Sequence, residues 1–179
     1  MNERASESAE SVISRLSATV SDYPKPGIAF RDLTPVFADG PALHTIVHAL
    51  IDPFEGQFDA VAGIEARGFL LAAAGAYASG KGVVTVRKKG KLPRRTISED
   101  YALEYGTATL EIHADELVPG SRVLILDDVL ATGGTLGAAC RLFERAGVQV
   151  AGFGVVLELS ALRGRSALTG HRIRSLVRE

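Results

Sequence analysis

Two adjacent aspartates, Asp127 and Asp128, follow an apolar run at residues 123–126 and precede a glycine-rich turn. A continuous apolar run of this kind is typical of a strand buried on both faces of a parallel sheet. Ligands bind beyond the carboxyl ends of such strands, which is where we expect these two carboxylates. At that place they could hold the hydroxyl groups of a sugar, or a metal ion.

The turn after the aspartates reads Ala131-Thr132-Gly133-Gly134-Thr135 and opens a predicted helix. N–H groups at a helix start have no partner within the helix, so the amides of this turn could bind a phosphate group. The glycine spacing fits neither the Rossmann motif nor the P-loop. Taken alone, the two glycines could form an ordinary turn and an aspartate could be a helix cap. The order of strand, two acids, turn and helix indicates a sugar-phosphate site.

Basic residues follow the carboxyl ends of two other predicted strands. Arg67 comes after a strand predicted near 59–63, and its guanidinium suits phosphate oxygens, although a lone surface arginine is the alternative. A second strand, predicted at 83–86, ends in a basic run that contains no acid. That run is either a solvated loop or the counter-charge for a pyrophosphate leaving group. It comprises Arg87, Lys88, Lys89 and Lys91.

Glu104 lies between two tyrosines in a polar segment, residues 93–106, that shows no clear period. We predict a mobile loop there that leads into a hairpin over the site. Glu104 is either a general acid or base that acts when the loop closes, or simply an exposed residue. Residues 107–113 alternate between polar and apolar types and predict an antiparallel strand. Its water-facing side would carry Thr107, Thr109, Glu111 and His113.

The remaining elements must position these residues. Apolar periodicity predicts an N-terminal helix at 3–19 with Val20 on its apolar side, a second helix opened by Asp39-Gly-Pro41, and a third at 68–78. Further strands are predicted at 148–157 and 172–177. Alternation of strands and helices implies right-handed crossovers, and hence an α/β fold with a mostly parallel central sheet flanked by helices. The length of 179 residues suits a single domain, 1–179.

The composition excludes several function classes. A net charge of −1 and the lack of a long basic stripe argue against nucleic acid as a partner. No apolar run could span a membrane, and the polar N-terminus does not resemble a signal peptide. The single cysteine, Cys140, rules out an internal disulfide and is expected in the core. These features predict a cytoplasmic protein.

Taken together, the motifs resemble the adenine-specific branch of the type I phosphoribosyltransferase family, over almost the whole chain. The segment at 123–135 is shared across that family, whereas those at 23–32, 65–69, 87–93 and 101–106 resemble the adenine enzymes. The resemblance implies the type I phosphoribosyltransferase fold, with a small hood from about 20–38 and a flexible loop at about 93–106.

The same resemblance implies a purine-salvage pentosyltransferase. Its substrates would be adenine and 5-phosphoribosyl 1-pyrophosphate, its products AMP and pyrophosphate, and its form a homodimer with Mg²⁺ held mainly by substrate and water. A cis peptide bond would join Glu65 to Ala66. The implied base site is the Phe30 ring with the backbone of Ala29, Phe30 and Arg31. Pyrophosphate would be bound by Arg67, Lys88 and Lys91, with Arg87 lent across the dimer, and the ribose by Asp127 and Asp128. The 5′-phosphate would be bound by the amides of Ala131, Thr132, Gly133, Gly134 and Thr135, and Glu104 would transfer the proton.

Two departures from the family pattern concern the substrate rather than the reaction. Ala29 replaces a valine often found there, and Arg94 and Arg95 add charge where a small residue is common. One alternative is therefore a type I enzyme for a 6-oxopurine. A second alternative, from a different class, is a sensor that binds phosphoribosyl pyrophosphate without catalysis.

Overall fold

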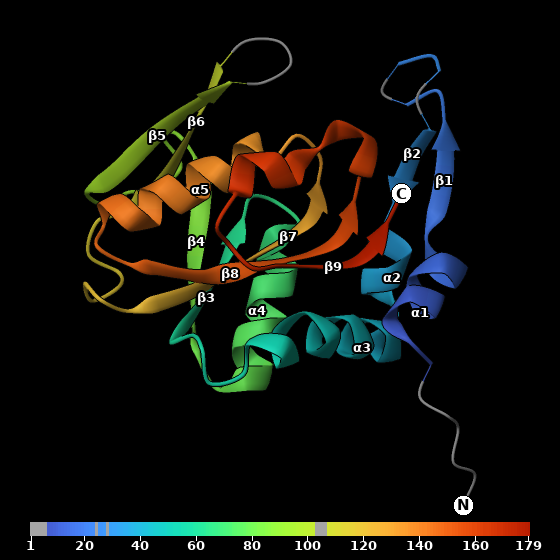
Figure 1. The fold of residues 1–179 in the computed structure, drawn as a ribbon, viewed down its shortest axis with the longest axis horizontal. Coiled ribbons are helices and arrows are strands. Elements are labelled where there is room, and N and C mark those ends of the chain that lie inside the picture. The colour runs from blue at the N-terminus through green and yellow to red at the C-terminus, as the bar shows by residue number, and fades with distance from the viewer. Residues whose placement is uncertain (1–6, 24, 28, 103–106) are drawn as a thin grey trace, which may run out of the picture.

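A computed structural model describes residues 7–23, 25–27, 29–102 and 107–179, and it shows one central sheet with helices on both faces (Figure 1). The sheet has seven strands in the order β5-β6-β4-β3-β7-β8-β9. Neighbours from β4 through β3, β7 and β8 to β9 are parallel, whereas β6 is antiparallel to both β4 and β5. The strands are β3 (Ala60–Ile64), β4 (Gly82–Lys88), β5 (Thr96–Ala102), β6 (Thr107–His113), β7 (Arg122–Leu130), β8 (Gln149–Glu158) and β9 (Ile173–Arg178).

The helices form two layers around this sheet. One face is covered by α1 (Ala9–Leu16), α2 (Thr34–Ala38), α3 (Gly40–Ile51) and α4 (Gly68–Ser79), and the other by α5 (Gly134–Arg145). Short 3₁₀ turns are η1 (Asp52–Phe54), η2 (Ser160–Leu162) and η3 (Gly164–Leu168), and a separate two-stranded sheet pairs β1 (Ala18–Ser21) with β2 (Ala29–Asp32). The α/β fold with a mostly parallel sheet is confirmed. No helix in the described part of the chain is long and apolar enough to cross a bilayer.

The central strand β7 shows why an unbroken apolar run predicted a strand buried on both faces. Leu124 and Leu126 belong to the core beneath α3 and α4, whereas Val123 and Ile125 belong to the core beneath α5. All four side chains are fully buried. Side chains alternate across a strand, so a strand between two helical layers needs apolar residues at every position.

The predictions for 83–86, 148–157 and 172–177 are confirmed to within two residues, and that for 68–78 to within one. The N-terminal helix is shorter than predicted. It ends at Leu16, because Ser17 adopts an extended conformation and its hydroxyl donates to the Ile13 carbonyl. The chain then enters β1, which leaves Val20 exposed rather than packed on a helix face.

The prediction of an irregular segment at 93–106 is wrong for residues 96–102, which form β5. Ile97 and Tyr101 pack against the core beneath α5, and Glu99 on the same face binds Arg141 and Arg145 of that helix. A charged residue at an inward position hid the two-residue period from the sequence. Residues 103–106, including Glu104, lie outside the described residues.

The prediction that all four polar residues of β6 face water is wrong for the last two. Glu111 and His113 are buried. Glu111 accepts a hydrogen bond from the Gly90 N–H at 2.9 Å, and His113 Nδ1 lies 2.6 Å from Glu116 Oε1. Buried polar groups are tolerated when such partners are present.

Candidate active site

Three adjacent parallel strands bring the predicted site residues to one edge of the sheet. Strand β3 lies between β4 and β7, so the carboxyl ends of all three meet there. The loop after β3 carries Arg67, β4 ends in the basic run, and β7 carries the aspartate pair followed by the glycine-rich turn. This is the edge at which ligands bind in open parallel sheets.

The two aspartates form a compact acidic centre with a single guanidinium. Asp128 is buried, and its Oδ2 lies 2.6 Å from Nε of Arg67 in an ion pair that lacks hydrogen-bond alignment. The Asp128 N–H donates to Oδ1 of Asp127 at 2.9 Å. Burial, together with the charge of Asp128, raises the pKa of Asp127 well above its usual range. Two carboxylates thus face one guanidinium, and the raised pKa shows that the second negative charge is unfavourable here unless a cation or a cationic group approaches.

The glycine-rich turn between β7 and α5 can bind an anion. Among the described residues, no backbone carbonyl accepts from the amides of residues 131–136. Gly133 has a φ of +81°, and a Cβ at this position would lie 2.4 Å from the carbonyl oxygen of Gly164. Only glycine fits this turn against η3. The turn encloses a cavity of about 70 Å³, lined by Asp127, Val129, Leu130, Ala131, Thr132, Gly133, Thr135 and Leu136.

The basic run is positioned by an acid that the sequence reasoning overlooked. Glu65 Oε2 accepts from the Lys88 N–H at 3.1 Å and from Arg87 Nε at 3.3 Å, and the Glu65–Ala66 peptide is cis, as the resemblance implied. Burial alone would raise the pKa of Glu65, but the Lys88 amide and the Arg87 guanidinium outweigh it and lower that pKa. Lys88 and Lys91 keep their side chains exposed. The positive charge left for a ligand is therefore that of the lysines more than of Arg87.

The β1–β2 hairpin brings an aromatic ring to the arginine of the site. The Arg67 guanidinium carbon lies 5.6 Å from the centre of the Phe30 ring, and the Tyr23 ring packs edge-on against Phe30 at 5.3 Å. The Arg31 side chain points elsewhere, with Nε donating to the Ser17 hydroxyl at 2.7 Å. The structure thus connects the Phe30 ring to the acidic centre through Arg67, while the Arg31 side chain is occupied elsewhere, which leaves its expected backbone role untested.

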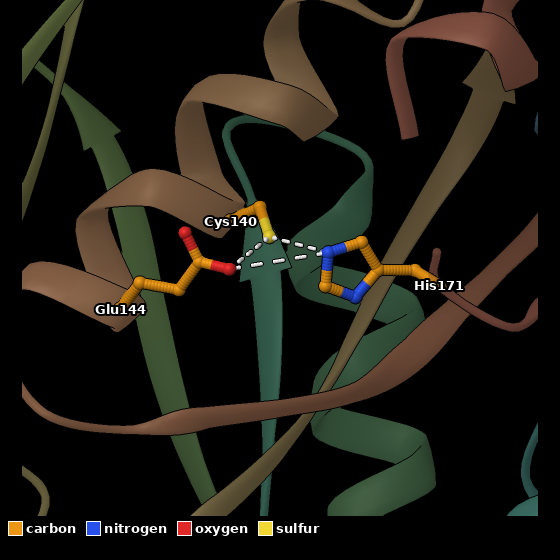
Figure 2. Close-up of side chains that lie close together, drawn as sticks. All are labelled: Cys140, Glu144 and His171. Carbon is orange, nitrogen blue, oxygen red and sulfur yellow. Dashed lines mark hydrogen bonds and ion pairs between the residues drawn. The ribbon is translucent and has the colours of Figure 1, made fainter. Parts of the chain in front are cut away.

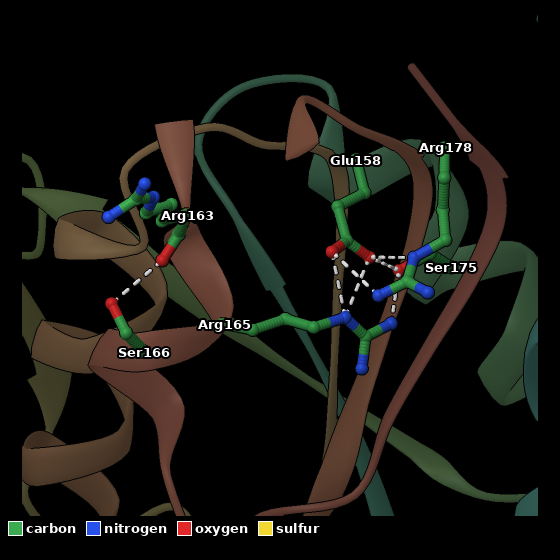
Figure 3. A network of polar contacts seen from close by, with 6 residues as sticks. All are labelled: Glu158, Arg163, Arg165, Ser166, Ser175 and Arg178. Carbon is green, nitrogen blue, oxygen red and sulfur yellow. Dashed lines mark hydrogen bonds and ion pairs between the residues drawn. The ribbon is translucent and has the colours of Figure 1, made fainter. Parts of the chain in front are cut away.

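The segment behind the glycine-rich turn is held by another buried acid, Glu158 (Figure 3). Glu158, at the end of β8, accepts hydrogen bonds from Arg165 of η3, from Arg178 and from the Ser175 hydroxyl. Burial alone would raise the pKa of Glu158, but these donors lower it to about 2. Arg165 is next to Gly164, so this network fixes the carbonyl that Gly133 contacts. No local sequence signal marked Glu158 or Gly164.

Comparison with known proteins agrees with this arrangement of a parallel sheet, an acidic pair and a glycine-rich turn, and places the chain among the phosphoribosyltransferases. Residues 41–170 match the family described as the phosphoribosyl transferase domain, and the chain belongs to that family. Within it, the chain groups with the adenine phosphoribosyltransferases. A relative of that name from Arthrobacter sp. (strain FB24) is 74% identical over 175 residues, covering 98% of this chain and 95% of the relative.

Solved structures of adenine phosphoribosyltransferases also resemble this chain over nearly its whole length. The crystal structure of adenine phosphoribosyltransferase from Rhodothermus marinus DSM 4252 superposes with a TM-score of 0.89 at 46% identity, covering 96% of this chain and 98% of that one. The Saccharomyces cerevisiae enzyme, solved as a complex with an imino-altritol bisphosphate and adenine, also gives 0.89, at 33% identity and with 94% and 98% covered. The type I phosphoribosyltransferase fold is therefore confirmed.

Proposed function

We propose that this protein transfers the phosphoribosyl group of 5-phosphoribosyl 1-pyrophosphate to adenine, giving AMP and pyrophosphate in purine salvage. The observation that carries this proposal is the junction of β7 and α5. There two aspartates that share one guanidinium, and a row of amides with no backbone acceptor in the described part of the chain, lie in one continuous segment. Relatives up to 74% identical and named adenine phosphoribosyltransferase support adenine as the acceptor.

The 5′-phosphate would bind the amides of residues 131–135, where the start of α5 adds favourable electrostatics. That contact places the ribose over Asp127 and Asp128, whose carboxylates would accept from its hydroxyls. As the bond to pyrophosphate breaks, positive charge develops on the sugar, and the excess negative charge of the pair stabilises it. Arg67, Lys88 and Lys91 would meet the negative charge that builds on the departing pyrophosphate.

The base would bind under a hood formed by residues 20–38, that is, by the β1–β2 hairpin and α2. The Phe30 ring would stack on the purine, and the backbone of Ala29 and Arg31 would contact its edge. We assign the proton at the adenine ring to Glu104, on the segment at 93–106, on the strength of its match to the family motif. A closed segment there would exclude water from a reactive sugar cation.

Mg²⁺ fits this chemistry and these residues. Its preferred ligands are oxygens, and the site offers the carboxylates of Asp127 and Asp128, with one Asp128 oxygen lacking an aligned donor among the described residues. Bound through water and substrate oxygens, the ion would add positive charge beside the pyrophosphate.

Two further assignments rest on the family likeness and on composition. We propose a homodimer, in which Arg87 contributes to the active site of the partner subunit. Light scattering on the purified chain tests this assignment, and a monomer that is fully active contradicts it.

We also propose a cytoplasmic location, since a chain with one cysteine has no internal disulfide and suits a reducing compartment. Cell fractionation tests that placement.

The decisive experiment incubates the protein with phosphoribosyl pyrophosphate, Mg²⁺ and each purine base in turn, with separation of the nucleotides formed. We expect AMP from adenine and little product from hypoxanthine, guanine or xanthine. Turnover of a 6-oxopurine without AMP would reassign the base. Tight binding of phosphoribosyl pyrophosphate with no turnover of any base would make the protein a sensor.

A further inference from the structure

A second group of potential ligands lies away from the active site, on α5 and in the loop before β9. Figure 2 shows Cys140, Glu144 and His171 pointing toward one another. Sγ of Cys140 lies 3.4 Å from Nε2 of His171 and 3.5 Å from Oε1 of Glu144, and the last two atoms are 3.9 Å apart. Cys140 and Glu144 share one face of α5 because they are four residues apart.

Two of these three separations match those between ligands of one tetrahedral ion, and the third is somewhat longer. With metal–sulfur bonds of about 2.3 Å and metal–nitrogen or metal–oxygen bonds of about 2.0–2.1 Å, tetrahedral angles place two ligand atoms about 3.3–3.6 Å apart. The two distances to sulfur lie within that range, whereas the 3.9 Å between Nε2 of His171 and Oε1 of Glu144 exceeds the roughly 3.3 Å expected for a nitrogen–oxygen pair by about 0.6 Å. An ion could therefore bind with small side-chain movements and no change in the backbone.

We propose that Cys140, Glu144 and His171 bind Zn²⁺, with solvent at the fourth position. A thiolate and an imidazole select a borderline-soft divalent ion over Mg²⁺, which prefers oxygen ligands and six-fold coordination. The site is thus chemically distinct from the aspartate pair.

Burial and access support the same assignment. Cys140 is buried, the His171 side chain is about one-quarter exposed (25%) and the Glu144 side chain is 53% exposed, so the ion can enter from the carboxylate side. The His171 ring packs edge-on against Phe153 at 5.5 Å between ring centres, which limits its orientations. Two of the three ligands are therefore held in place before the ion arrives.

Without an ion the thiol keeps its proton. Burial first, then the nearby charge of Glu144, raises the pKa of Cys140 to about 12. Binding must therefore exchange the thiol proton for Zn²⁺, and the proton leaves to solvent. A bound ion would also tie α5 to the loop that follows η3, and so would add to the stability of the folded chain.

The first test titrates the full, metal-free chain with Zn²⁺ in the presence of a competing chelator, and with Co²⁺ as a spectroscopic probe. We expect one ion per chain and a thiolate-to-cobalt charge-transfer band in the near ultraviolet. Cys140→Ser should abolish that band. Glu144→Gln and His171→Gln should each weaken Zn²⁺ binding at least about tenfold. A large excess of Mg²⁺ should not displace Co²⁺.

The matched control is His48→Gln. His48 and Asp52 form an exposed pair on the surface, 3.1 Å apart and also four residues apart, but they have no sulfur neighbour. This variant should bind Zn²⁺ as the parent does. Thermal unfolding in the presence of chelator establishes that each variant is folded. If Cys140→Ser is unstable, Glu144→Gln still tests the site, because Glu144 is exposed and its substitution should leave the fold intact.

Three results would overturn the proposal. They are the lack of stoichiometric binding by the parent chain, a cobalt spectrum without a thiolate band, and affinities of Glu144→Gln and His171→Gln equal to that of His48→Gln. Each is independent of phosphoribosyl transfer, so the zinc site can fail while the proposed reaction stands.

Discussion

Two neighbouring strands carry buried acids to the same edge of the sheet, and the acids are treated in opposite ways. At the end of β7, Asp127 and Asp128 share one guanidinium, and the pKa of Asp127 is raised. At the end of β8, Glu158 alone receives two guanidiniums and a hydroxyl, and its pKa is lowered to about 2. The strands are in register there, with Leu130 beside Glu158.

The number of donors around each carboxylate distinguishes Glu158, which stabilises the fold, from Asp127 and Asp128, which are available to a ligand. A buried charge whose hydrogen-bonding capacity is filled has little left to offer, whereas an under-neutralised pair gains when a cation or a cationic transition state arrives. Asp128 and Glu158 are both buried, so burial alone does not distinguish them.

The largest expected effect is on activity at the aspartate pair. Asp127→Asn should lower kcat/KM for phosphoribosyl pyrophosphate about 100- to 1000-fold, as expected for loss of a charge that stabilises the transition state. The midpoint of thermal unfolding should not fall, because the substitution relieves repulsion from Asp128. Steady-state kinetics and a thermal melt on one preparation check both. A variant that is destabilised but fully active would show that Asp127 stabilises the fold rather than the transition state.

Glu158→Gln should show the reverse pattern. Two guanidiniums would lose their buried partner, so we expect a loss of about 3 kcal/mol in the free energy of unfolding, measured with urea. The matched control is Asp59→Asn, which breaks the exposed pair with Arg122, whose ions lie 2.7 Å apart. The control should lose clearly less, because exposed pairs are screened by solvent. Equal losses would show that burial of Glu158 contributes nothing.

Gly133→Ala should break the contact that joins the two regions. The added methyl group meets the Gly164 carbonyl, and the backbone φ is positive, so the phosphate turn must shift. We expect KM for phosphoribosyl pyrophosphate to rise about tenfold or more, since a small misplacement of a binding group is costly. Gly80→Ala is the control: its φ is +66° but nothing lies within 4 Å. If Gly133→Ala and Gly80→Ala raised KM equally, the positive φ alone, and not the contact with Gly164, would explain the effect.

The smallest expected effect is in the acid dependence of stability. The pKa of Glu158 is lower in the folded chain than in the unfolded one, so its stabilising effect is complete above about pH 4.5 and is lost toward pH 2. Urea unfolding across this range should show a shallower fall in Glu158→Gln than in the parent chain, by at most about 1.4 kcal/mol per pH unit. Asp59 titrates in the same window, so Asp59→Asn serves again as the comparison. Identical slopes in the parent chain and Glu158→Gln would contradict the assignment.

The sequence predicted what depends on short stretches of chain. The apolar run of β7, the acids after it and the glycine turn are local patterns, and each lies where it was expected. Contacts between distant segments were not predictable in this way. The inward position of Glu99 on β5 depends on two arginines of α5, and the place of Glu65 beside Arg87 depends on the pairing of β3 with β4.

The same limit applies to single side chains. The Arg31 guanidinium donates to the Ser17 hydroxyl and lies 3.6 Å from Glu179, and these partners come from opposite ends of the chain, so no local pattern indicated them. Glu158 belongs to an apolar strand and carries no motif, and only the meeting of η3 with β9 gives it a role.

Strand β7 contributes alternate side chains to both cores, and this has a consequence for the motions of the site. Because both faces of β7 are buried and both edges are paired, with β3 and with β8, we expect its amide hydrogens to be among the slowest in the sheet to exchange with solvent. The aspartates thus extend from a strand that is fixed on both faces and both edges. We therefore expect the acidic pair to keep its position when a ligand binds.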